Sequence, residues 1–185
     1  MINFSLEEII VLGLLTGLHF VLNLPILKIY VPICLGTISF KTFPLFLIAL
    51  NFSFLKSFIT ILFCAVFDWF LSGYPLYTFV FDYAVPYLII LILVSFKNKI
   101  ISENHKCKNF IFGCVMFFIF AVRLFSHVVS GVLFYEVSFI NAFLYNFPSC
   151  FANDCINFFL LLFFLKQNHR YRLIHEENGN SFQEL

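Results

Sequence analysis

The sequence predicts an all-α integral membrane protein with six transmembrane helices and with both termini in the cytoplasm. Hydrophobic residues make up 62% of the 185 positions, and charged residues only 11%. A soluble domain of this length could not bury so much apolar surface. Several apolar runs also approach the ~20 residues that an α-helix needs to cross a bilayer. Composition and the length of these runs therefore indicate the class of protein.

Charged and turn-forming residues divide the apolar runs into six predicted helices. They cover residues 9–29, 43–55, 57–71, 76–96, 110–134 and 139–165. The second is short because Lys41 and Lys56 flank it, so it could be partly buried, join the third helix or only re-enter the membrane. We predict a six-helix membrane domain over residues 1–166 and a polar cytoplasmic tail over residues 167–185.

Basic residues predict the orientation, because lysine and arginine concentrate on the cytoplasmic side of a membrane. Most of them follow the second, fourth and sixth helices: Lys56, Lys97, Lys99, Lys106, Lys108, Lys166, Arg170 and Arg172. The other connections carry only Lys28 and Lys41. Both termini are therefore predicted to be cytoplasmic. The net charge of +1 indicates no nucleic-acid partner, and no metal-ligand spacing is visible.

Three polar residues from different predicted helices fall at nearly the same depth below the outer surface. With a rise of about 1.5 Å per residue, Asp82 and His127 lie about 10 Å below that surface and Asn146 about 12 Å below it. Polar groups are costly to bury in a membrane, so such a cluster indicates a function. Aromatic residues gather at this level: Tyr74, Tyr77, Tyr83, Tyr135, Phe139 and Tyr145. A carboxylate among electron-rich rings predicts a pocket for an organic cation with a flat heterocycle.

Structural roles for these polar residues remain open at this point. Asp82 could pair with Arg123, which lies one turn from His127 on the same helix. His127 and Asn146 could instead form hydrogen bonds between helices. Arg123 has no evident role in binding, so we expect it to be structural.

Other intramembrane polar residues are expected to serve packing or anchoring. Asp154 is expected to form a packing network with Asn153 and Asn157. Asp68 and Trp69 are placed at the outer end of the third helix, where a tryptophan usually marks the membrane interface. None of these residues is predicted to bind a ligand.

The first helix and the connection that follows it suggest two further features. Gly13 and Gly17 form a small-xxx-small pair that would let another helix approach closely. That partner could be a helix of this chain or another subunit. Residues 30–40 are predicted to form an extended outer loop that can cover the outer site.

Four segments carry a resemblance to a known family: LGTISFKTFPLFLIAL, FDYAVPYLI, RLFSHVVSGVLFY and NAFLYN, in that order. Together they resemble the thiamine-specific branch of the substrate-binding S components of energy-coupling factor (ECF) transporters, over about residues 8–165. RxxxHxxSG with a downstream YN is the more specific part. The resemblance implies capture of a vitamin at the outer face of a prokaryotic plasma membrane. It also implies association, through small residues of the first helix, with a coupling subunit and two ATPases, and it implies no cofactor.

The resemblance implies six substrate-binding residues: Asp82, Tyr83, His127, Tyr135, Asn141 and Asn146. Asp82 stands where the family has an acidic residue near the thiazolium ring of thiamine. Tyr135 falls where a ring-stacking tryptophan is expected, and Asn141 takes the place of a pocket tyrosine. Gly13 and Gly17 would form the partner-subunit interface.

The predicted function is a high-affinity thiamine-binding membrane subunit without enzymatic activity, and three alternatives remain. The changes at Tyr135 and Asn141 would also suit a precursor such as the hydroxymethylpyrimidine or thiazole moiety. An intramembrane enzyme could use His127 with Asp82 or Cys150, although no nucleophile–base motif is visible. A structural or assembly subunit would bind no small molecule.

Overall fold

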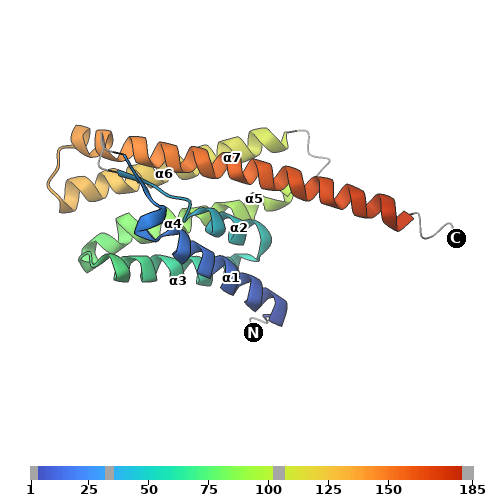
Figure 1. Ribbon diagram of the computed structural model, residues 1–185. Coiled ribbons are helices and arrows are strands. Elements are labelled where there is room, and N and C mark those ends of the chain that lie inside the picture. The colour runs from blue at the N-terminus through green and yellow to red at the C-terminus, as the bar shows by residue number, and fades with distance from the viewer. Residues whose placement is uncertain (1–3, 32–35, 102–106, 181–185) are drawn as a thin grey trace.

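The computed structural model describes residues 4–31, 36–101 and 107–180, which are mostly helical (Figure 1). The helices are α1 (Leu6–Leu22), α2 (Phe43–Asn51), α3 (Phe54–Ser72), α4 (Val85–Leu88), α5 (Ile92–Ile101), α6 (Lys108–Phe134) and α7 (Phe139–Asn180). Short 3-10 or π-helical turns lie at Pro25–Leu27, Leu76–Thr78, Val80–Ala84 and Ile89–Leu91. Strands β1 (Ile29–Val31) and β2 (Gly36–Ile38) form an antiparallel hairpin. Helices α6 and α7 run side by side and join at one end of the molecule.

Within the described residues, four helical segments are long and apolar enough to cross a membrane: Phe54–Ser72, Leu76–Ile101, Lys108–Phe134 and Phe139–Gln167. Large apolar side chains on their surfaces are exposed, for example Phe117 and Phe125 of α6, as expected of helices that contact lipid. These findings confirm an α-helical membrane protein. Helix α7 continues to Asn180, so the tail predicted from residue 167 begins with a helical backbone, and the domain boundary there stays a prediction.

Helix α1 begins and ends earlier than predicted, for local reasons. The Ser5 hydroxyl accepts a hydrogen bond from the Glu8 amide at 3.2 Å, and the Glu8 carboxylate accepts one from the Ser5 amide at 2.9 Å. This capping box starts the helix at the turn before the apolar run. The helix stops at Leu22 because Pro25 disfavours helical geometry in the residue before it. Hydropathy did not show this end, because most of residues 20–29 are apolar and only Asn23 and Lys28 interrupt them.

The second predicted helix is not a full membrane span. Helix α2 has 9 residues, which gives a length of about 14 Å against a hydrocarbon core of about 30 Å. It ends because Phe52 adopts an extended conformation, and Lys97 Nζ donates to the Phe52 carbonyl oxygen at 2.9 Å. Residues 44–50 are all buried among α1, α3, α5 and α7, within the largest apolar core of the molecule. Helix α2 is therefore an internal helix surrounded by its neighbours.

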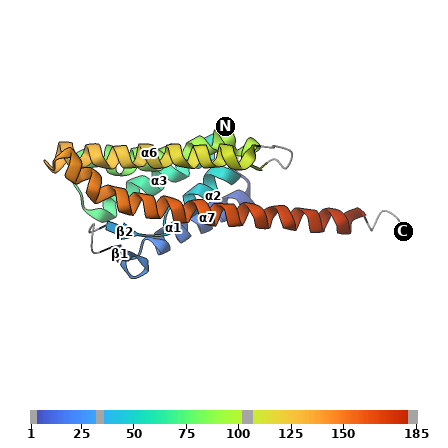
Figure 2. The same ribbon diagram turned by 90° about the horizontal axis from the view of Figure 1, so that it is seen from above.

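Polar side chains form hydrogen bonds with the backbone of the hairpin and of the irregular segment that leads to α2. Figure 2 shows the hairpin beside α7, where Asn153 donates to the Thr37 carbonyl at 2.9 Å and accepts from the Ser39 amide at 2.7 Å. His19 of α1 lies with Nδ1 2.6 Å from the Lys41 carbonyl oxygen. Non-helical backbone is tolerated at membrane depth only where protein groups satisfy it. These two side chains therefore fix the start of α2 against α1 and α7.

The packing network predicted around Asp154 has different partners. Asp154 forms a buried ion pair with Arg123 of α6, whereas Asn157 donates to Thr42 Oγ1 at 2.8 Å. Arg123 thus takes part in a structural contact, as expected. The pair between Asp82 and Arg123, which the sequence left open, does not form. The two residues lie on suitable helices, but Arg123 faces α7 instead.

Candidate substrate-binding site

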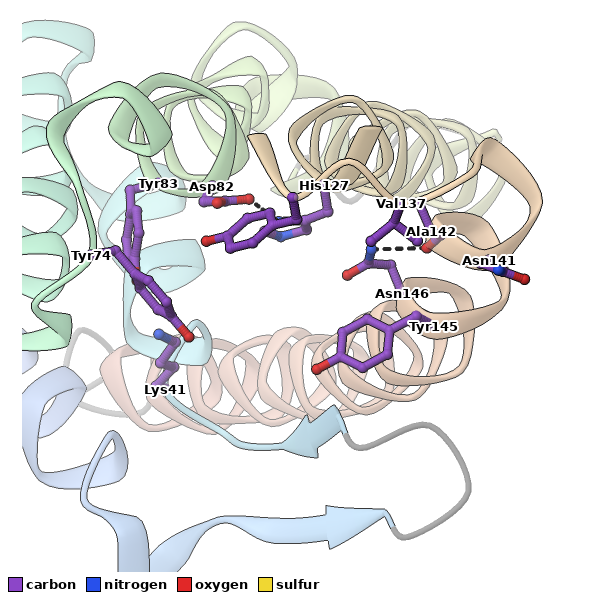
Figure 3. A pocket seen from close by; sticks show the side chains of 12 residues that line it. Lys41, Tyr74, Asp82, Tyr83, His127, Val137, Asn141, Ala142, Tyr145 and Asn146 are labelled. Carbon is purple, nitrogen blue, oxygen red and sulfur yellow. Dashed lines mark hydrogen bonds and ion pairs between the residues drawn. The ribbon is translucent and has the colours of Figure 1, made fainter. Parts of the chain in front are cut away.

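A pocket of about 580 Å³ lies between the π-helical turn, α6 and the start of α7 (Figure 3). It is near the end of the molecule where α6 and α7 join. All six residues predicted from the sequence line it: Asp82, Tyr83, His127, Tyr135, Asn141 and Asn146. Its volume and its mixture of aromatic and polar side chains are typical of sites for small organic molecules.

The FDYAVPY segment positions the carboxylate through a widened helical turn. Asp82 and Tyr83 lie in the π-helical turn that precedes α4. In an α-helix the amide of residue 86 would bond to the carbonyl of Asp82, but Pro86 has no N–H. The Ser126 hydroxyl of α6 donates to the neighbouring Phe81 carbonyl at 2.5 Å. Such π-turns occur frequently at functional sites.

Two side chains of α6, Ser130 and His127, contact the Asp82 carboxylate, which remains accessible from the pocket. The Ser130 hydroxyl donates to Oδ2 at 2.7 Å, and His127 Nδ1 lies 3.3 Å from Oδ1. The Asp82 side chain is 19% exposed, so a ligand in the pocket can reach it. Among the described residues no lysine or arginine pairs with it. The Asp82 carboxylate can therefore pair with a cationic ligand in the pocket.

Tyrosine rings form much of the pocket wall. Tyr74, Tyr83, Tyr135 and Tyr145 all line it, and the rings of Tyr74 and Tyr135 meet edge to face with centroids 6.5 Å apart. Burial is the main cause that raises the pKa of Tyr135, and the negative charge of the nearby Asp82 carboxylate raises it further. Its phenol therefore stays neutral at physiological pH. Neutral electron-rich rings beside a carboxylate suit a cationic heterocycle.

Two predicted amides differ in how they face the pocket. Asn146 points towards it in Figure 3, and its Nδ2 donates to the Ala142 carbonyl at 2.9 Å within α7 rather than to another helix. Asn141 lies at the rim, is exposed, and directs its amide away from the other side chains. Tyr77 and Phe139, which were expected at this level, do not line the pocket. The described hairpin residues do not line it either, so its covering by residues 30–40 stays a prediction.

Lys41, which just precedes α2, also lines the pocket and was not among the predicted site residues. Its Nζ lies 3.0 Å from Asp68 Oδ2, and Asp68 is buried rather than at a surface end of α3. A lysine on the predicted outer side, against the usual charge distribution, was the signal that could have found it. Trp69 beside Asp68 donates Nε1 to the Pro75 carbonyl at 3.3 Å and is not a lining residue.

Gly131 lets α6 and α7 approach closely at the pocket. A Cβ added there would lie 3.0 Å from the Ala142 Cβ, so the helices would have to separate by a few tenths of an ångström. We expect Gly131→Ala to lower the free energy of unfolding by about 1 kcal/mol and to weaken ligand binding. Gly113→Ala is the matched control in α6, because an added Cβ there meets no atom within 4 Å. Thermal unfolding in detergent measures both, and equal shifts would contradict the close-approach argument.

An apolar helical bundle with a carboxylate in an aromatic pocket near one end is typical of a membrane protein that binds a small molecule. Residues 9–173 match the family described as "Thiamine transporter protein (Thia_YuaJ)", and the chain belongs to this family. Comparisons with curated proteins and with solved structures found no match. The protein is thus a thiamine transport component and not an enzyme, so the intramembrane-enzyme alternative is wrong.

Proposed function

We propose that the protein is the high-affinity thiamine-binding S component of an ECF-type vitamin uptake transporter. The observation that carries the proposal is the Asp82 carboxylate, accessible in an aromatic pocket of a thiamine transporter family member. Thiamine joins a positively charged thiazolium ring to an aminopyrimidine ring. A carboxylate pairs with such a cation, and tyrosine faces attract it further.

Each lining residue has a role in this proposal. Asp82 neutralises the thiazolium, while Tyr83 and Tyr135 contact the ring faces. His127 and Asn146 hydrogen-bond the edge of the aminopyrimidine. Because His127 Nδ1 faces Asp82, the Nε2 of a neutral ring is the acceptor for the amino group. Asn141 would contact the ligand only after its side chain turns inwards.

We further propose that the pocket faces the outside of a prokaryotic plasma membrane and that both termini are cytoplasmic. Lys56 and Lys97 support this orientation. Lys56 lies in the first turn of α3, just after α2, and Lys97 of α5 donates to Phe52 at the end of α2 opposite the pocket-lining Lys41. Helix α2 starts close to the depth of the pocket, since the pocket-lining Lys41 lies two residues before its first residue, Phe43.

Calorimetric titration of the detergent-purified protein tests the ligand. Calorimetry is preferred to tryptophan fluorescence because Trp69 does not line the pocket. We expect sub-micromolar binding of thiamine and binding at least about 100-fold weaker for its pyrimidine and thiazole halves, because each half keeps only part of the contacts. A half that binds as tightly as thiamine would instead favour the precursor-specific alternative. Absence of thiamine binding would reject the proposal.

The exposed glycines of α1 are the proposed contact with the ECF coupling subunit, which works with two ATPases. A Cβ added at Gly13 or Gly17 meets no atom within 4 Å, so no described helix of this chain uses the close approach that they allow. We expect Gly17→Leu to reduce co-purification with co-expressed coupling and ATPase subunits by about tenfold. Thiamine affinity of the isolated chain should stay within about twofold, since Gly17 is not a lining residue. Gly113→Leu, at an equally open position on α6, is the control, and an equal loss there would contradict the assignment.

A further inference from the structure

The pocket contains a cation as well as a carboxylate. The Lys41 side chain lines it and is 24% exposed. Figure 3 shows Lys41 beside Tyr74, on the opposite side of the pocket from Asn146. A site for a cationic ligand is a costly place for a second positive charge, because like charges repel strongly at low dielectric. A lysine in this wall is therefore expected to have a negatively charged partner and a role in binding.

Asp68 supplies the compensating charge. It is 3% exposed, and its Oδ2 lies 3.0 Å from Lys41 Nζ. Asn23 donates to its Oδ1 at 2.9 Å, the Tyr87 hydroxyl donates to Oδ2, and His19 Nε2 lies 3.4 Å from Oδ2. The carboxylate is thus held from several helices. The Lys41–Asp68 pair is neutral as a unit, so it does not repel a cation bound at Asp82.

The same contacts fix the position of the ammonium group. Lys41 is anchored at its backbone by His19 Nδ1, which lies 2.6 Å from its carbonyl oxygen, and its Nζ lies 5.6 Å from the centre of the Tyr87 ring. An ammonium has three N–H donors, and among the described residues Asp68 is its hydrogen-bond acceptor. The remaining donors are available to a molecule in the pocket. They can bond only to an acceptor, such as an oxygen atom.

We propose that Lys41 is a specificity-determining residue that donates a hydrogen bond to an oxygen on the tail of the bound molecule, either a hydroxyl or a phosphate-ester oxygen. The proposal rests on thiamine as the ligand. Asp82 takes the charged ring and Asn146 the amino-bearing ring, which leaves the oxygen-bearing tail of thiamine for the Lys41 side of the pocket. An analogue without that oxygen would leave a donor of Lys41 unmet in a partly buried site, and the pocket would discriminate against it.

The test compares three ligands by calorimetry on the full chain: thiamine, the analogue with hydrogen in place of the hydroxyl, and thiamine monophosphate. The variants are Lys41→Met and the double variant Lys41→Met/Asp68→Asn, which leaves no unpaired carboxylate buried and so preserves folding. Lys28→Met is the control, because Lys28 is a lysine of the same predicted side that does not line the pocket.

We expect the unaltered protein and Lys28→Met to bind thiamine about tenfold more tightly than the analogue without the oxygen. In the Lys41 variants this ratio should fall to within about twofold, with little change for the analogue itself. A larger loss for thiamine monophosphate than for thiamine would assign the contact to phosphate oxygens, and equal losses would assign it to the hydroxyl oxygen. Either result supports the proposal.

Three results would overturn the proposal, and they distinguish the failure of the Lys41 contact from the failure of the proposed function. If thiamine binds and the tenfold ratio persists in the double variant, Lys41 does not contact the oxygen, and the proposed function stands. The same conclusion follows if the unaltered protein binds thiamine and the analogue equally well. If the unaltered protein does not bind thiamine at all, the proposed function and the role of Lys41 fall together.

Discussion

Replacing Asp82 by asparagine is expected to weaken thiamine binding by about 10- to 100-fold. Asparagine keeps the size of the side chain and can still accept the hydrogen bond from Ser130, so the fold should be retained. What is lost is the negative charge that pairs with the thiazolium in a partly buried site. Calorimetric titration in detergent measures the affinity, and thermal unfolding checks that the variant is folded.

Glu7→Gln is the matched control for Asp82→Asn. It removes a carboxylate that is exposed near the start of α1 and does not line the pocket, so thiamine affinity should be unchanged. If Asp82→Asn also left affinity within about twofold, charge pairing at this site would be wrong. Asp82 would then serve only as the acceptor that joins Ser130 and His127 to the π-helical turn.

Replacing Arg123 by methionine is expected to destabilise the protein by about 3–5 kcal/mol. The substitution leaves Asp154, which is 5% exposed, without its partner in the contact between α6 and α7. A buried unpaired carboxylate must either remain charged at high cost or take up a proton. The midpoint of thermal unfolding in detergent measures the loss.

The double variant Arg123→Met/Asp154→Leu separates the ion pair from packing. Two apolar side chains of similar size remove both charges, so most of the stability should return. Arg123 does not line the pocket, and thiamine affinity of the folded double variant should stay close to that of the unaltered protein. Equal destabilisation of the single and double variants would show that side-chain packing, not the charge pair, holds α6 and α7 together here.

The last four membrane helices could be predicted from the sequence because long apolar runs between charges need no tertiary information. Phe54–Ser72, Leu76–Ile101, Lys108–Phe134 and Phe139–Gln167 each contain or nearly match a predicted span. The first two predictions were less accurate. Helix α1 ends before Pro25, and α2 ends at Asn51, where Phe52 turns the backbone to an extended conformation within the predicted span. Hydropathy shows whether a segment prefers an apolar environment, but it does not show the backbone geometry of that segment.

The residues around the pocket could also be grouped from the sequence, because helical rise sets the depth of each side chain. Asp82, His127 and Asn146 indeed line one pocket, although their binding of thiamine stays a prediction. Depth alone does not give the rotation of a helix about its axis. Arg123 lies one turn from His127, yet it pairs with Asp154 and not with Asp82.

By itself the sequence determined the membrane class, the family and the residues from which a thiamine site can be built. Only the tertiary structure decided that α2 is enclosed by other helices and that Lys41 reaches the pocket beside a buried Asp68. The reason is physical: Lys41 and Asp68 are 27 positions apart, and Arg123 and Asp154 are 31 apart. Whether such groups meet depends on how whole helices pack and rotate, which apolar patterning leaves undetermined when lipid and protein interior are equally apolar.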